Sequence, residues 1–230
     1  MAGLSTEETT QTAQAQPAEL IRRIAGFSVG CTILAFGIVL SVKANLGAAA
    51  WDVLHLAIAQ RVGLSLGQAS ILVSAILVVL TVLLGGRWTV SWGTVANALL
   101  VGWAIDGFLA LGIPGAASIP ARVVYLAGAI FFLALGSVVY TRVGLGAGSR
   151  DGLILVLSQR LPLTVGRIRL FLEFLVAVGG WLLGGPIGVG TLAIVVGTGP
   201  TADLLFRVLG RGYLPDTVRI PESPRHRRAV

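Results

Sequence analysis

The sequence has few charged residues, one cysteine and two histidines, and each shortage excludes a class of protein. Only 12% of its 230 residues are charged while 55% are hydrophobic, whereas a soluble domain carries about 25% charged residues. Because so few charges cannot cover a globule in water, the composition argues against a soluble enzyme, a nucleic-acid-binding domain and a disordered regulator. The mean hydropathy of +0.89 instead predicts an integral membrane protein whose surroundings are the lipid bilayer.

The scarce residue types also limit the chemistry. Cys31 is the only cysteine, so the chain forms no intrachain disulfide. Two histidines, of which one lies near the C-terminus, argue against a histidine-based metal centre. The sequence contains no Walker loop, no zinc-ligand pattern and no Ser-His-Asp set. We therefore expect no enzymatic activity, no cofactor, no metal and no nucleic-acid partner.

The hydrophobic residues are grouped in runs of the length that a bilayer requires. A transmembrane helix needs about 20 mostly apolar residues, and two shorter stretches of about a dozen residues, near 18 Å as helices, fall below the roughly 30 Å hydrocarbon core. We predict an all-α integral membrane fold with six transmembrane helices and two short re-entrant or interfacial helices. The six runs are residues 24–42, 66–84, 90–111, 123–140, 165–183 and 187–209, and the short stretches are 49–60 and 150–160.

Positive charge predicts the orientation. With a cytoplasmic N-terminus, the six-span arrangement places 14 Lys and Arg inside and 3 outside, as the positive-inside rule requires. If both short stretches also spanned the membrane, 13 Lys and Arg would lie inside and 4 outside. Both arrangements put both termini in the cytoplasm. Residues 1–20 are predicted to be a disordered leader and residues 212–230 a disordered basic tail.

The two halves of the chain repeat each other. LGAAAWDVLHLAIAQRVGLSLG, from Leu46, matches LGAGSRDGLILVLSQRLPLTVG, from Leu145, at an offset of 99, and a later match has an offset of 97. We predict membrane repeats at residues 21–112 and 120–211. The coinciding pairs include Gly47/Gly146, Asp52/Asp151, Arg61/Arg160, Ser65/Thr164, Gly67/Gly166, Gly93/Gly190, Thr94/Thr191, Gly102/Gly199 and Asp106/Asp203.

The number of spans in each repeat decides their relative orientation. Three spans are an odd number, so six spans make the repeats inverted, as in many secondary transporters. If the short helices also span, each repeat has four spans and the two are parallel. We expect the inverted arrangement, in which the short helices enter from opposite sides.

The paired turns are the first candidate for a binding site. Gly47 and Gly146 allow tight turns, and the helix starts behind them expose unpaired N–H groups that suit an anion. The alternative is that the two aspartates cap or balance their own helices. The candidate substrate-binding residues are Gly47, Trp51, Asp52, His55, Gly146, Arg150 and Asp151.

Within this set, Asp52 and His55 lie three residues apart on one helix face and would be able to relay a proton. The second half has Ile154 in place of His55, which makes any relay asymmetric. The alternative is an interfacial histidine near water.

Four charged residues inside the predicted spans form a second group of candidates. Asp106 and Asp203 occupy matched places near the ends of the third and sixth spans, where a carboxylate is costly unless it has a role or reaches the headgroups. Arg169 and Glu173 are four residues apart in the fifth span, a spacing that also suits a structural ion pair.

One stretch resembles a known family. The stretch resembles the YczE/YyaS/YitT group of bacterial membrane proteins in three elements. These are Gly47, the segment Trp51-Asp-Val-Leu-His55, and the segment Gly63-Leu-Ser65 followed by Gly67. The likeness extends over residues 22–211. It implies a multi-pass protein of the bacterial plasma membrane and brings no catalytic residues with it.

These features favour a small secondary transporter or permease for a small-molecule or ion solute, working alone or as a homo-oligomer. The alternative is a non-transporting membrane regulator or assembly partner of another protein.

Overall fold

The structure is a computed structural model that describes residues 17–209, and within this range all of its regular secondary structure is helical. The predicted tail and most of the predicted leader lie outside the described residues. The α-helices are α1 (Pro17–Lys43), α2 (Ala50–Val62), α3 (Leu66–Leu83), α4 (Trp92–Ala110), α5 (Ile119–Arg142), α6 (Ser149–Arg160), α7 (Val165–Leu182) and α8 (Val189–Leu209), and a short 3₁₀ helix η1 (Arg87–Thr89) precedes α4.

Helix α1 begins at Pro17, before the expected start of the span at residue 24. The residues at its start favour a helix. Proline is compatible with the first helical turn, where its missing N–H costs nothing. In the same turn, Glu19 pairs with Arg22 at 2.8 Å and with Arg23 at 3.1 Å. These contacts extend the helix beyond its apolar part.

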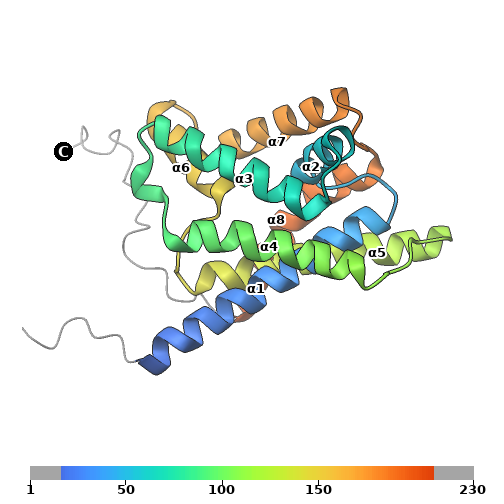
Figure 1. The fold of residues 1–230 in the computed structure, drawn as a ribbon, viewed down its shortest axis with the longest axis horizontal. Coiled ribbons are helices and arrows are strands. Elements are labelled where there is room, and N and C mark those ends of the chain that lie inside the picture. Colours follow the sequence, from blue (N-terminus) through green and yellow to red (C-terminus); the bar gives the residue numbers. More distant parts are fainter. Residues whose placement is uncertain (1–16, 210–230) are drawn as a thin grey trace, which may run out of the picture.

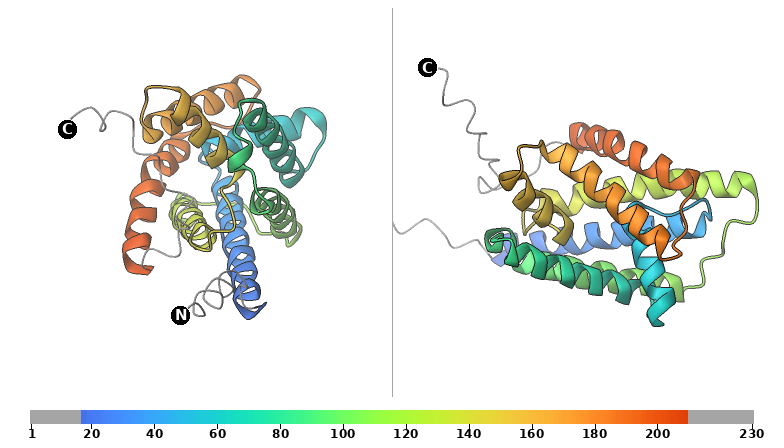
Figure 2. Two further views of the ribbon diagram at one scale, coloured as in Figure 1. Left: turned by 90° about the vertical axis from the view of Figure 1, so that its left-hand side faces the viewer. Right: turned by 90° about the horizontal axis from the view of Figure 1, so that it is seen from above.

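Long, short, long and long helices follow one another in α1 to α4 and again in α5 to α8. Helices α1 and α5 run in opposite directions side by side (Figure 1). Helix α6 lies toward the end of the molecule where α1 begins, and α2 lies toward the end where α1 finishes (Figures 1 and 2). The two short helices therefore lie toward opposite ends of the molecule.

The core is built on the α1–α5 pair, with α4 packed on α1 and α8 packed on α5. Glycines let the two central helices approach closely. A side chain at Gly30 would collide with the backbone of Tyr140, and one at Gly136 with the backbone of Leu34. Small residues at such crossings are typical of helix pairs in membranes, where close van der Waals packing replaces the hydrophobic effect.

Each short helix packs mainly against a long helix of the other half: α2 against α7, and α6 against α3. Helix α2 ends at Gly63, which takes the left-handed conformation with φ of +74°. The cross-packing ties the halves together at the level of the short helices.

Five described helices, α1, α3, α4, α5 and α8, are long and apolar enough to cross a membrane. The chain is therefore a multi-spanning helical protein. The predicted fifth span corresponds to α7, which is not among these five. Its 18 residues include three charged ones, Arg167, Arg169 and Glu173.

Candidate functional site

The first glycine turn is held by the other half of the molecule. Leu46 O accepts a hydrogen bond from Gly190 N at 2.8 Å, and Ala48 N donates to Pro186 O at 3.3 Å. Gly47 has a φ of +101°, and a side chain there would strike Gly188. The turn before α2 is thus fixed by the start of α8.

The second turn is held in the matching way by the start of α4. Thr94 Oγ1 donates to Ala147 O at 2.8 Å, and Ser91 Oγ donates to Leu145 O at 3.2 Å. Gly146 has a φ of +151°, and a side chain there would overlap Ser91. Both candidate glycines are therefore required by their turns, and the repeated Gly-Thr pairs at the starts of α4 and α8 serve those turns.

Asp52 and His55 form a buried pair in the first half of α2. His55 Nδ1 lies 3.2 Å from Asp52 Oδ1, and both side chains are about 1% exposed. Burial lowers the pKa of His55, the hydrogen bond with Asp52 opposes this shift, and the charge of Arg150 adds to it. A neutral ring that donates Nδ1–H to the carboxylate leaves Nε2 as an acceptor, and this Nε2 is buried without a partner among the described residues.

In the second half, Asp151, which matches Asp52, is hydrogen-bonded to a tyrosine and not to a histidine. Tyr140 Oη donates to Asp151 Oδ2 at 3.2 Å. Tyr140 was not among the predicted residues, although a tyrosine inside an apolar span needs a partner for its hydroxyl group. The helix N-caps, Ala49 and Gly148, make no side-chain hydrogen bond, and neither aspartate caps its helix.

A side-chain contact joins the start of α2 to the start of α6. The guanidinium carbon of Arg150 lies 5.0 Å from the centre of the Trp51 ring, a cation–π distance. Among the described residues Arg150 forms no ion pair with a carboxylate. Trp51 and Arg150 therefore connect the two helix starts, while Gly47 and Gly146 stay with the separate turns described above. Within the described residues, Arg150 is a cation without a carboxylate partner and Nε2 of His55 is an acceptor without a hydrogen-bond partner.

Of the other charged candidates, Arg169 is close enough to interact electrostatically with Asp151, whereas Asp106 and Asp203 belong to other contacts or surfaces. Asp106 accepts from Ser65 Oγ at 2.5 Å and from Gly67 N at 2.9 Å, so it joins α4 to α3. Asp203 is exposed on α8. Arg169 Nε lies 3.2 Å from Glu173 Oε1 along α7, which agrees with the predicted ion pair.

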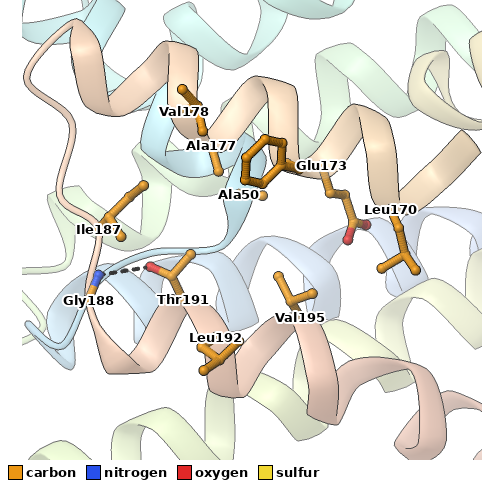
Figure 3. Close-up of a pocket in the computed structure, with 11 residues that line it drawn as sticks. Ala50, Leu170, Glu173, Ala177, Val178, Ile187, Gly188, Thr191, Leu192 and Val195 are labelled. Carbon is orange, nitrogen blue, oxygen red and sulfur yellow. Dashed lines mark hydrogen bonds between the residues drawn. The ribbon is translucent and has the colours of Figure 1, made fainter. Parts of the chain in front are cut away.

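A groove of about 370 Å³ separates α7 from α8. Figure 3 shows Leu170, Glu173 and Ala177 of α7 facing Thr191 and Val195 of α8. The lining is almost entirely apolar, and Glu173 is its charged residue. No sequence signal predicted this groove.

Comparison with known proteins gives three relatives, each matched over most of its length. The chain is 32% identical over 182 residues to the uncharacterized membrane protein YczE of Bacillus subtilis, covering 79% of this chain and 84% of the relative. It is 30% identical over 181 residues to an uncharacterized protein of Haemophilus influenzae, covering 78% and 81%. It is 24% identical over 190 residues to the uncharacterized protein YyaS of Bacillus subtilis, covering 82% and 94%.

No solved structure matches the chain. The relatives confirm the resemblance to YczE and YyaS that the Trp51–His55 stretch predicted. A single family model matches residues 21–207, which include nearly all of the described helices. The chain belongs to the family of unknown function DUF6198 and is a multi-spanning membrane protein of that family.

Proposed function

We propose that this protein is a small secondary transporter of the bacterial plasma membrane and that it binds its solute where α2 and α6 meet. The contact between Trp51 and Arg150 carries the proposal, because it unites two helix starts from different halves. Transporter sites are built in this way, from discontinuous or short helices at the interface of two repeats.

The proposal includes six spans in two inverted repeats, formed by α7 together with the five long apolar helices. The ion pair between Arg169 and Glu173 supports this, because it neutralises two of the three charges of α7. The opposite directions of α1 and α5 support inversion (Figure 1). Both termini then lie in the cytoplasm, and α2 and α6 enter from opposite sides.

Topology is tested with single cysteines at Arg61 and Arg160, introduced into a Cys31→Ala background. A membrane-impermeant maleimide should label position 61 from the outside and position 160 only after the membrane is opened. Labelling of both from the same side would contradict inversion.

The unpaired groups indicate the chemistry of the solute. Arg150 suits an anionic group, and Nε2 of His55 accepts a hydrogen bond from an N–H or O–H group. A small carboxylate that also carries an amino or hydroxyl group satisfies both. Amino acids and hydroxy acids are therefore the solutes to try first.

The direct test is uptake of labelled amino acids and hydroxy acids by proteoliposomes. We expect Arg150→Gln, Asp52→Asn and Asp151→Asn to abolish uptake, while Arg22→Gln, at an exposed position in the second turn of α1, retains it. Equal uptake by all variants would show that these three residues do not form the solute-binding site. Absence of uptake of any probe, together with co-purification of a protein partner, would instead favour a regulator or assembly partner.

A further inference from the structure

Four residues hold α3 and α4 together near the start of α3. Ser65 Oγ and Gly67 N donate to the carboxylate of Asp106, and both glycines of the contact, Gly67 and Gly102, are buried. A side chain at Gly67 would collide with Gly102 O. We call Ser65, Gly67, Gly102 and Asp106 the closed contact.

The repeat supplies a counterpart for each of these residues: Thr164, Gly166, Gly199 and Asp203. We call these four the open counterpart, because all of them are exposed and a side chain added at Gly166 or at Gly199 would have no neighbour within 4 Å. The groove of Figure 3 separates other parts of α7 and α8, and on α8 its lining ends at Val195, before Gly199 and Asp203.

We propose that the structure is one of two states, and that in the other state α7 and α8 close through the open counterpart while α3 and α4 separate. In the proposed orientation the closed contact lies on the outer side and the open counterpart on the cytoplasmic side, so the described state faces inward. As a mechanism of alternating access the proposal rests on the proposed transport function. The closure itself can be measured without a solute.

The residues needed for closure are in place. Thr164 precedes α7 with φ of −72° and ψ of 151°, close to the −67° and 163° of Ser65 before α3. Ser65 caps its helix, whereas the Thr164 side chain makes no cap hydrogen bond. Gly166 N is among the first N–H groups of α7, which have no acceptor within the helix. Both donors are therefore available to Asp203.

Helix α8 also contains a place where it can bend. Pro200 lies inside the helix, between Gly199 and Asp203, and its ring removes one hydrogen bond and prevents regular packing of the preceding turn. Helix α4 has Trp103 at the matched position. The end of α8 that carries Asp203 can therefore swing toward the start of α7.

The test measures distances between spin labels by pulsed electron paramagnetic resonance. The full-length Cys31→Ala protein is reconstituted in phosphatidylethanolamine–phosphatidylglycerol vesicles, and labels are placed at Leu163 and Leu204, next to the open counterpart. A second protein is labelled at the matched positions, Leu64 and Gly107. Neither label pair replaces a residue of either contact.

We expect two distances between labels at 163 and 204, the shorter one equal to the main distance between labels at 64 and 107. Asp106→Asn should raise the share of the short distance about fivefold, as expected for one net hydrogen bond lost from the closed contact. Gly166→Leu should remove the short distance, and its side chain enters open space, so the described state remains folded.

A single long distance in both the Asp106→Asn and unsubstituted proteins would overturn the proposal. That result is also expected if lipid chains or a second copy permanently fill the groove, and a second copy would add a distance in singly labelled protein. Two distances without uptake of any solute would support closure while the transport proposal fails. Uptake of a solute with one fixed distance would support transport, while the proposal of closure fails.

Discussion

The helix pairs α3–α4 and α7–α8 have matched residues at matched positions, yet one pair is closed and the other is open. Asp106 accepts two hydrogen bonds at the closed contact, whereas Asp203 is exposed. Where α3 has the buried residues Ser70 and Ser74, α7 has Arg169 and Glu173. The comparison teaches that a repeated motif specifies which helix contact can form. The side chains around the motif then decide whether that contact forms.

The largest difference is expected for leucine at the matched glycines Gly67 and Gly166. Gly67→Leu drives a side chain into Gly102 and Asp106 and should cost about 3 kcal/mol or more. Gly166→Leu meets no neighbour and should leave stability unchanged within about 0.5 kcal/mol. Thermal unfolding in detergent measures both, and equal losses would show that α7 and α8 are closed in solution.

A smaller difference is expected for the two aspartates. Asp106→Ala removes the acceptor of two hydrogen bonds and leaves Gly67 N without a partner, which should cost about 2 kcal/mol. Asp203→Ala removes an exposed carboxylate and should cost less than about 0.5 kcal/mol. The same unfolding assay applies, and a larger loss for Asp203 would reverse our assignment of the closed pair.

The turns extend the comparison to the short helices. Thr94→Val removes a 2.8 Å hydrogen bond to Ala147 O and should cost about 1 kcal/mol. Thr191 accepts a longer hydrogen bond, 3.3 Å, from Gly188 N, so Thr191→Val should cost less. Serine at each position is the control, because it retains the hydroxyl group, and it should preserve most of the stability.

The smallest effect on stability is expected at the charged residues of α7. Replacing Arg169 and Glu173 by serine, the residue of the matched α3 positions, removes an ion pair in which Arg169 is 59% exposed, and such pairs contribute about 0–1 kcal/mol. Unfolding should change little. The short distance between labels at 163 and 204 should become more frequent, and a decrease would show that the ion pair favours closure.

Most helix positions were predictable because their signals are local. The expected short stretch at residues 150–160 agrees with α6 (Ser149–Arg160), and the run at 66–84 agrees with α3 (Leu66–Leu83). Ser65 and Gln68 form a reciprocal capping box at the start of α3, which is readable from four consecutive residues. Hydropathy alone did not predict the earlier start of α1 because its first two turns contain the charged residues Glu19, Arg22 and Arg23, which pair with one another.

Only part of the candidate site was predictable. The spacing of Asp52 and His55 on one turn of a helix predicts their contact, which the structure shows at 3.2 Å. The bond between Tyr140 and Asp151 joins two helices, and no local pattern specifies it. The contact of Trp51 with Arg150 likewise depends on how the two halves dock.

By itself, the sequence determined that this chain belongs in lipid, where its helices lie and which residues the two halves share, because hydropathy, caps and coincident residues can be read along the chain. Only the tertiary structure decided that Asp106 has hydrogen-bond partners while the matched Asp203 has none among residues 17–209, and that Trp51 of α2 contacts Arg150 of α6. The physical reason is range: a helix forms through contacts between residues about four apart, whereas these contacts join residues from different helices.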